Sequence, residues 1–272
     1  LKIKQLHPED PYINISLMEY YQKQGDLDKA FEEFILSIKN KNLDYNTKAQ
    51  IYEYWFGEKS GENESVVKEA KLAGEAFIEA HPDKELGYYV IGTVYFNDDI
   101  FDKAQEYYLE AIERDSSNFI SWYQLVFADI ELNNSKNLYE HSSAAMRFYP
   151  EQPIFYLFNG VSLSDMKKYE EAIKVFEKGR FLSADKKLTA NFDTYIADIY
   201  NVLGDKEKMY RQYDRVLKND PDNIYVLNNY AYFLSLDNVR LDEALKMSAK
   251  TVEKEPKNVT YLDTYAWVLY KM

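Results

Sequence analysis

The chain contains three histidines, and the residues around them give little support to acid–base catalysis or metal binding. His7 and His81 each precede a proline, which places them in loops between helices. His141 lies in the stretch LYEHSSAAM, within an expected helix, and no second histidine stands three or four positions away to complete a zinc pair. The absence of cysteine excludes thiolate catalysis, disulfides and cysteine-ligated zinc. The sequence therefore predicts no catalytic residue and no metal ligand.

Carboxylates are abundant, but composition alone accounts for their pairs. Asp98-Asp99 and Glu170-Glu171 are typical of solvated turns and helix starts. The stretch NDPDN at 219–223 has the composition of a calcium loop, yet it lacks the glycine and the closing glutamate that such a loop needs. Phosphate-binding glycine loops and nucleophile elbows are missing as well. We therefore predict a protein that is not an enzyme and uses no cofactor.

The charge balance limits the classes of partner. The 46 Asp and Glu residues against 33 Lys and Arg give a formal net charge of −13, which repels nucleic-acid backbones. The longest apolar run falls well short of the roughly 20 residues that a membrane-spanning helix needs, so we expect no direct membrane insertion. Hydrophobic residues make up 46% of the chain, which is enough for a folded core. Among the classes of partner considered, proteins and peptides remain.

An internal repeat organises the sequence. Small or compact residues recur in similar apolar surroundings in YYVIGTVYF, WYQLVFADI, YLFNGVSLS, TYIADIYNV, LNNYAYFLS and LDTYAWVLY. Intervals of 34, 34, 37, 34 and 35 residues separate Gly92, Val126, Gly160, Ala197, Ala231 and Ala266. A second set, with intervals of 34, 34, 37 and 35 residues, consists of Ala104, Leu138, Ala172, Met209 and Ala244. The agreement of the two registers indicates a true repeat.

Each repeat unit predicts two helices. In DTYIADIYNVLGDKEKMYRQYDRVLKNDPDN, at 193–223, apolar residues recur three and four apart on both sides of a short polar break. Gly204 is expected to end the first helix and Asp205 to cap the second. The second helix should end at Asp220, because the residue before a proline is pushed out of the α region.

This pattern resembles the tetratricopeptide repeat, a 34-residue unit with bulky, small and aromatic residues at fixed places. Residues 85–118 carry the match in Tyr88, Ile91-Gly92, Tyr95, Ala104, Tyr108 and Ala111. The resemblance implies an all-α fold, a right-handed α-solenoid superhelix of helix-turn-helix repeats, with a single array over residues 1–272. We place repeats at about 11–44, 45–84, 85–118, 119–152, 153–189, 190–223 and 224–258, with partial repeats at 1–10 and 259–272. The stretch GEKSGENES lengthens the turn of the second repeat.

The last stretch, LDTYAWVLYKM, is apolar on nearly every side as a helix. Solenoid ends normally carry a polar outer face, because each repeat rests only on its neighbours. Two explanations remain: further chain follows in the natural protein, or another molecule packs against Trp267 and Tyr270. The solenoid argument favours further chain.

The resemblance also implies a binding face, because ligands of such arrays meet the first helices along the concave groove. The matching positions give an aromatic middle and nearby amides, and the candidate binding residues are Tyr89, Phe96, Tyr123, Phe127, Asn228, Asn229, Tyr232, Trp267 and Tyr270. None of the matching positions is a lysine or an arginine, which disfavours the capture of chaperone C-terminal carboxylates. About half of the aromatics are expected to pack between repeats instead.

The leading functional hypothesis is a non-catalytic scaffold that binds a protein or peptide in the concave groove. One alternative is a regulatory or positioning segment of a larger protein whose activity lies elsewhere. Another is a self-associating array in which the exposed terminal helices meet, with Trp267 and Tyr270 against Leu1, Ile3 and Leu6. The closing repeats are similar to those of bacterial proteins in the periplasm or attached to the outer membrane, so a cell-envelope location is expected, with the cytoplasm as the alternative.

Overall fold

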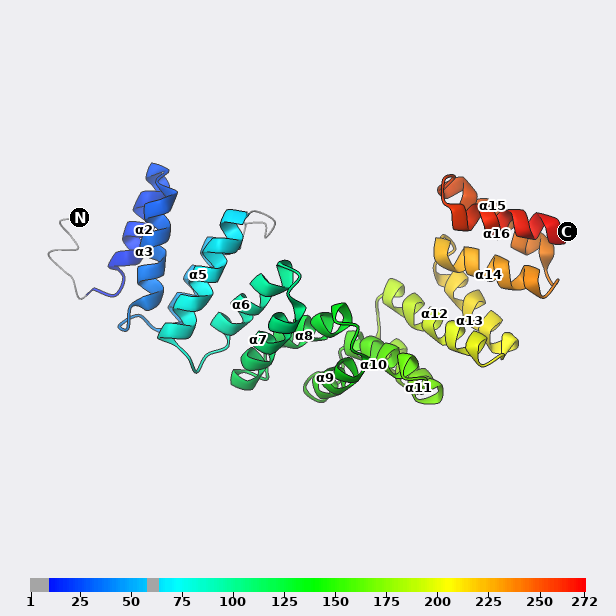
Figure 1. The fold of residues 1–272 in the computed structure, drawn as a ribbon, viewed down its shortest axis with the longest axis horizontal. Coiled ribbons are helices and arrows are strands. Elements are labelled where there is room, and N and C mark those ends of the chain that lie inside the picture. Colours follow the sequence, from blue (N-terminus) through cyan, green and yellow to red (C-terminus); the bar gives the residue numbers. More distant parts are fainter. Residues whose placement is uncertain (1–9, 58–63) are drawn as a thin grey trace. The chain divides into compact units, whose positions relative to one another are not determined.

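Helices account for all the regular structure in the part of the chain that the computed structural model describes, residues 10–57 and 64–272 (Figure 1). Residues 1–9 of the expected partial repeat at 1–10, His7 among them, and most of GEKSGENES therefore lie outside the described residues. The helices are α2 (Ile13–Gln24), α3 (Leu27–Lys39), α4 (Tyr45–Phe56), α5 (Glu64–Ala80), α6 (Leu86–Asn97), α7 (Phe101–Arg114), α8 (Phe119–Glu131), α9 (Ser135–Phe148), α10 (Pro153–Asp165), α11 (Tyr169–Leu182), α12 (Lys186–Val202), α13 (Lys206–Asn219), α14 (Ile224–Leu236), α15 (Leu241–Lys254) and α16 (Val259–Lys271). We call the even-numbered helices first helices and the odd-numbered ones second helices.

Short polar residues set the helix ends. A capping side chain accepts a hydrogen bond from a backbone N–H of the first turn at Asp26, Asp44, Asn118, Asp185, Asp205, Asn223 and Asn258. At the other end, Gly25 and Gly204 adopt φ values of 77° and 75°, which only glycine takes at low cost. The predicted break at 204–205 is therefore present, and the NDPDN stretch caps α14 through Asn223.

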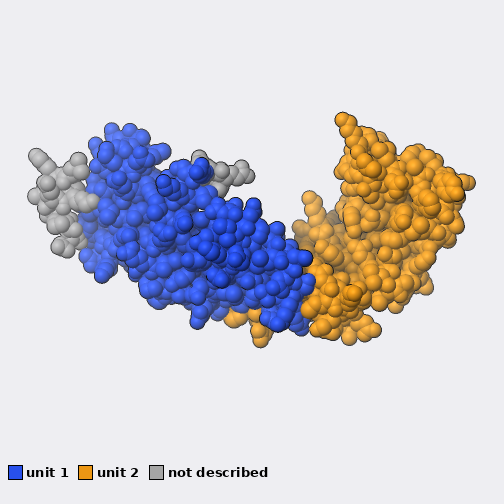
Figure 2. All heavy atoms as spheres, viewed as in Figure 1, with its two compact units in different colours: residues 1–141 blue, residues 142–272 orange. Residues whose placement is uncertain are grey.

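The chain divides into two compact units, residues 1–141 and residues 142–272, with the boundary inside α9 (Figure 2). In the first unit, α2 packs on α3, and α6 packs on both α5 and α7. In the second unit, α10 packs on α11, α12 on α13, and α14 on both α15 and α16. Most of these contacts join helices that are neighbours in the chain, as in an α-solenoid, and α3 packs on α5 as well. The all-α fold of helical hairpins is thereby confirmed.

Small residues of the first helices let the second helices approach closely. Gly160 on α10 faces the ring of Phe176 on α11, and a Cβ atom at Gly160 would lie 2.3 Å from its Cε1. Ala197 and Ala231, the equivalent residues of α12 and α14, are fully buried. Ala266 on α16 is exposed, because the described residues place no second helix against it. The two-register repeat thus marks the seam between the helices of each hairpin.

Candidate functional site

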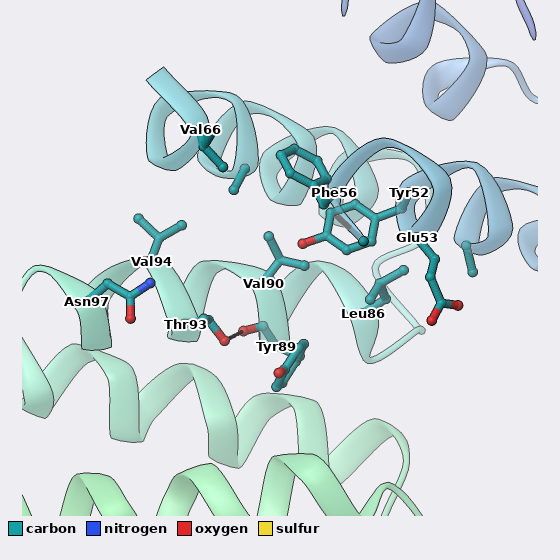
Figure 3. Close-up of a pocket in the computed structure, with 13 residues that line it drawn as sticks. Tyr52, Glu53, Phe56, Val66, Leu86, Tyr89, Val90, Thr93, Val94 and Asn97 are labelled. Atoms are coloured by element: carbon teal, nitrogen blue, oxygen red, sulfur yellow. Dashed lines mark hydrogen bonds between the residues drawn. The ribbon is translucent and has the colours of Figure 1, made fainter. Parts of the chain in front are cut away.

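A cleft with a volume of about 470 Å³ lies between the first helices α4 and α6, with the start of α5 beside them (Figure 3). We call it the α4–α6 cleft. Its walls are formed by Ala49, Tyr52, Glu53, Phe56, Gly57, Val66, Ala70, Leu86, Tyr89, Val90, Thr93, Val94 and Asn97. Clefts of 300 to 1,000 Å³ are typical of sites that hold small molecules or the anchoring side chains of partners.

The α4–α6 cleft is mainly apolar. The rings of Tyr52 and Phe56 lie 4.7 Å apart on α4 and face Val90 across the cleft (Figure 3). The Tyr52 phenol is uncharged at neutral pH, and burial raises its pKa further above the usual value. The Thr93 hydroxyl is already engaged, because it donates to the Tyr89 backbone oxygen at 3.0 Å. An apolar or aromatic side chain fits these walls better than a charged group does.

The candidate residues of α6 and α8 lie in the first unit. Tyr89 lines the α4–α6 cleft, whereas Phe96 packs edge-on against Phe101 at 5.2 Å. On α8, the half-buried rings of Tyr123 and Phe127 lie 4.7 Å apart. Phe119 extends this row, with its ring 5.9 Å from that of Tyr123. The row gives α8 an aromatic stripe along one face.

A second cleft, of about 400 Å³, lies between α12 and α14 in the second unit. We call it the α12–α14 cleft, and it is lined by Asn191, Thr194, Tyr195, Asp198, Asn223 and Tyr225. Tyr213, on α13, donates a hydrogen bond from its hydroxyl to Asp198 Oδ1 at 3.1 Å. Burial raises the pKa of Asp198, and hydrogen bonds from Tyr213 and Tyr225 oppose that rise. This cleft is more polar than the first.

The predicted amide residues of α14 lie along the helix from Tyr225. Asn228 is buried, and its Nδ2 donates to Asn229 Oδ1 at 3.2 Å. Asn228 Oδ1 is also buried, but it has no hydrogen-bond partner in the described part of the chain. Tyr232, one turn farther on, is 39% exposed. These side chains continue the polar surface of the α12–α14 cleft along the helix.

The candidate residues of α16 differ in exposure. Trp267 is half-buried and Tyr270 is 78% exposed, with the two ring centroids 5.6 Å apart. Trp267 Nε1 is buried without a hydrogen-bond partner among the described residues. Leu262 and Leu269 are also exposed, so α16 presents the apolar surface that its sequence predicts.

Stability should respond to pH through Asp198. Its pKa is raised in the folded chain, so the folded state binds the proton more tightly than the unfolded state does. This group therefore contributes a destabilisation that is complete above the raised pKa and disappears as the pH falls toward about 4, the ordinary carboxyl pKa. We expect Asp198→Asn to raise the melting temperature at pH 7, and the gain to shrink by pH 4. Thermal unfolding at both pH values tests this, with Asp242→Asn on the surface of α15 as the control, and a lower melting temperature for Asp198→Asn at pH 7 would contradict it.

The two histidines that the structure describes, His81 and His141, contact side chains of neighbouring helices. His141 Nδ1 lies 2.8 Å from Oδ2 of the fully buried Asp129, and Gln105 Nε2 donates to the other carboxylate oxygen at 2.5 Å. These contacts connect α7, α8 and α9. His81 follows α5 directly, and its Nε2 lies 2.8 Å from Nζ of the buried Lys48. Burial and the neighbouring lysine lower the pKa of His81, and burial lowers that of Lys48.

The described residues contain no group of three or more His, Asp or Glu side chains placed to hold a metal ion. Among the described helices, none combines the length and hydrophobicity of a membrane-spanning segment.

The repeat pattern did not identify several residues of the two clefts as binding residues. Tyr52 fits the repeat pattern as a packing residue, and Phe56 stands one turn farther along α4. Their position in a cleft depends on the packing of α4 beside α6, which the repeat pattern leaves open. The hydrogen-bond partner of Asp198 was not predictable either, because Tyr213 comes from another helix.

Comparison with known proteins adds three kinds of similarity. The tetratricopeptide repeat family profile matches residues 87–118. A TPR repeat-containing protein of Methanocaldococcus jannaschii is 25% identical over 162 residues, which is 47% of this chain. The matched part spans only 28% of that relative.

Among solved structures, PilF of Pseudomonas aeruginosa is similar with a TM-score of 0.59 and 17% identity, over 87% of this chain and 98% of that one. YrrB, described as a TPR protein with an unusual peptide-binding site, has a TM-score of 0.55 and 18% identity, over 71% and 98% of the two chains. Yeast Tom70 has a TM-score of 0.57 and 17% identity, over 99% of this chain and 56% of that one. At these identities the structural similarities bear on the fold.

Proposed function

Because the chain belongs to the tetratricopeptide repeat proteins, we propose that it is a non-catalytic scaffold that binds a protein or peptide segment along its first helices. Proteins of this fold serve as protein–protein interaction scaffolds. The finer proposal concerns where the partner is held, and the observation that carries it is the α4–α6 cleft.

The α4–α6 cleft has the chemistry of an anchor site. Its apolar walls offer burial to one or two large side chains, and each well-buried aromatic anchor contributes about 2 kcal/mol or more to binding. Glu53 and Asn97 stand at its exposed edge, where they can orient the backbone of the bound segment. The aromatic stripe of α8, in the same unit, supplies further contact area at low entropic cost.

A photo-crosslinking experiment tests the anchor site. We replace Asn97 in the cleft with p-benzoylphenylalanine and irradiate the full chain in cells of its source organism. A crosslinked protein adduct is expected from position 97, and none of the same mass from the control position 109, where Leu109 is exposed on α7. Filling the cleft with Ala70→Phe should reduce the adduct about tenfold, because the anchor loses its space.

The matched control for the filling variant is Ala184→Phe, which adds the same ring at an exposed position of the second unit. Circular dichroism verifies that both variants keep their helicity. An unchanged adduct in the folded Ala70→Phe variant would exclude the cleft as the anchor site.

Three further hypotheses stay predictions. A role as the regulatory or positioning segment of a larger protein is tested by the sequence of the complete gene. Self-association through α16 is tested by light scattering at two concentrations; the opposing residues Leu1, Ile3 and Leu6 lie outside the described part. A location in the bacterial cell envelope is tested by fractionation of the source cells.

A further inference from the structure

Two aspartates on the same helix are held in contrasting ways. Asp193 on α12 is fully buried, and Arg180 and Arg215 reach its Oδ1 at 2.7 Å and 3.3 Å. Asp198, five positions later, is half-buried and faces the α12–α14 cleft. No lysine, arginine or histidine of the described residues comes within ion-pair distance of it. Asp193 is thus neutralised within the chain, while Asp198 receives hydrogen bonds from phenols that leave its charge in place.

The walls of the α12–α14 cleft suit a cation. Tyr195 and Tyr225 are 39% and 51% exposed, so both rings keep surface available to a ligand. The Tyr195 ring is held in place by stacking on the buried Phe176 at 5.4 Å. A cation above an aromatic face is attracted by the ring quadrupole, and a guanidinium group also stacks on it. A carboxylate between two tyrosines therefore matches the side chain of arginine, or of lysine.

A second feature lies one turn along α14. Asn228 is 5% exposed, and its side-chain oxygen Oδ1 has no hydrogen-bond partner in the described structure. A buried acceptor without a partner costs about 1 to 3 kcal/mol unless a donor reaches it. Asn228 Nδ2 donates to Asn229 Oδ1, and Asn229 lies one helical turn from Tyr225, a wall of the cleft. A polypeptide that binds here would have to uncover this oxygen of Asn228 before a backbone N–H could donate to it.

Charge also favours a basic partner. The chain carries a formal net charge of −13, so a basic segment is attracted and an acidic one is repelled. Among the six residues that line the α12–α14 cleft, Asp198 is the charged one, and it is acidic.

We propose that the α12–α14 cleft binds an arginine or lysine side chain presented by the partner polypeptide, with Asp198 pairing its charge and Tyr195 and Tyr225 flanking it. This inference rests on the proposed scaffold function and names the chemistry of the bound segment. The competing interpretation makes Asp198 a structural acceptor for Tyr213, which ties α12 to α13. The two interpretations predict different affinities of the cleft for a neutral ligand of the same shape as arginine.

The probes are N-acetyl-arginine amide and N-acetyl-citrulline amide, which differ mainly by the positive charge. We titrate each into the full ¹⁵N-labelled chain and follow the backbone amide signals of Tyr195, Asp198 and Tyr225. Saturable shifts are expected with the arginine probe, and binding of the citrulline probe should be at least about tenfold weaker.

Asp198→Asn keeps an acceptor for Tyr213 but removes the charge, so it should weaken arginine binding about tenfold. The matched control Asp242→Asn removes the same charge from the surface of α15, and should change affinity less than about twofold. Tyr225→Ala removes one aromatic wall and should weaken binding about threefold.

Equal binding of arginine and citrulline, no shift with either probe, or equal affinity in the two aspartate variants would overturn the proposal. Each of these outcomes leaves the photo-crosslinking result at position 97 unaffected. Loss of that adduct, in turn, would remove the anchor site without bearing on arginine binding, so the two proposals fail separately.

Discussion

Replacing Arg180 with methionine is expected to lower the free energy of unfolding by about 3 kcal/mol, because it leaves the buried carboxylate of Asp193 without its closest partner. The carboxylate is fully buried, and its Oδ2 has no hydrogen-bond partner among the described residues. Arg215 remains, but at 3.3 Å and with a half-exposed side chain it compensates only in part. Urea denaturation followed by circular dichroism measures the loss.

Two further variants show whether the uncompensated charge is the cause. Arg211→Met removes an exposed arginine that pairs with Glu207 on the surface of α13, and should cost less than about 1 kcal/mol. Adding Asp193→Leu to Arg180→Met should restore most of the lost stability, because no charge then stays buried. If the double variant is as unstable as the single one, the loss comes from packing of the arginine side chain instead.

The helices that lose stability in Arg180→Met can also be predicted. In stacked repeats each hairpin depends on its neighbours, so weakening one contact loosens the adjacent helices first. Arg180, Asp193 and Arg215 come from α11, α12 and α13. Hydrogen exchange in Arg180→Met should therefore accelerate in these helices and change little in α2 and α3.

The seams between paired helices were predictable from the sequence. The residues that the repeat spacing aligns, such as Gly160 and Ala231, are buried where a second helix crosses them. Such a position depends on a local requirement for small volume, which recurs in every hairpin and leaves a periodic trace. Helix ends were predictable for the same reason, since Gly204 and Asp205 act within a single turn.

The polar contacts across helices were not predictable. Asp193 and Asp198 are both aspartates on one helix, and nothing in the local pattern separates a carboxylate held by two arginines from one that faces a cleft. The difference arises from side chains on other helices, Arg180 and Arg215 in one case and Tyr213 in the other. Arg180 and Arg215 lie outside the periodic positions, so the repeat spacing carries no information about them. Tyr213 occupies the same repeat position as Tyr108 and Phe176, so the spacing predicts that its ring is buried but not which carboxylate its hydroxyl contacts.

The second large effect on stability is expected at the seam between α10 and α11. Gly160→Ala is expected to destabilise the chain by about 2 kcal/mol, although alanine improves helix propensity by about 1 kcal/mol. The added Cβ would lie 2.3 Å from Cε1 of Phe176, and that ring is fully buried and cannot move into solvent. Overpacking therefore outweighs propensity. Thermal and urea unfolding measure the change, and a Gly160→Ala variant more stable than the natural chain would contradict the argument.

The control and the rescue follow from the same geometry. Ala197→Gly, at the equivalent position of α12, should lose about 1 kcal/mol, because that seam already accommodates a Cβ atom. Phe176→Leu added to Gly160→Ala removes the ring atoms that clash and should recover part of the stability. Phe176 also stacks on Tyr195, a wall of the α12–α14 cleft. A ring displaced at the seam should therefore shift Tyr195 and weaken arginine binding, which couples the packing of α10 and α11 to the chemistry of the cleft.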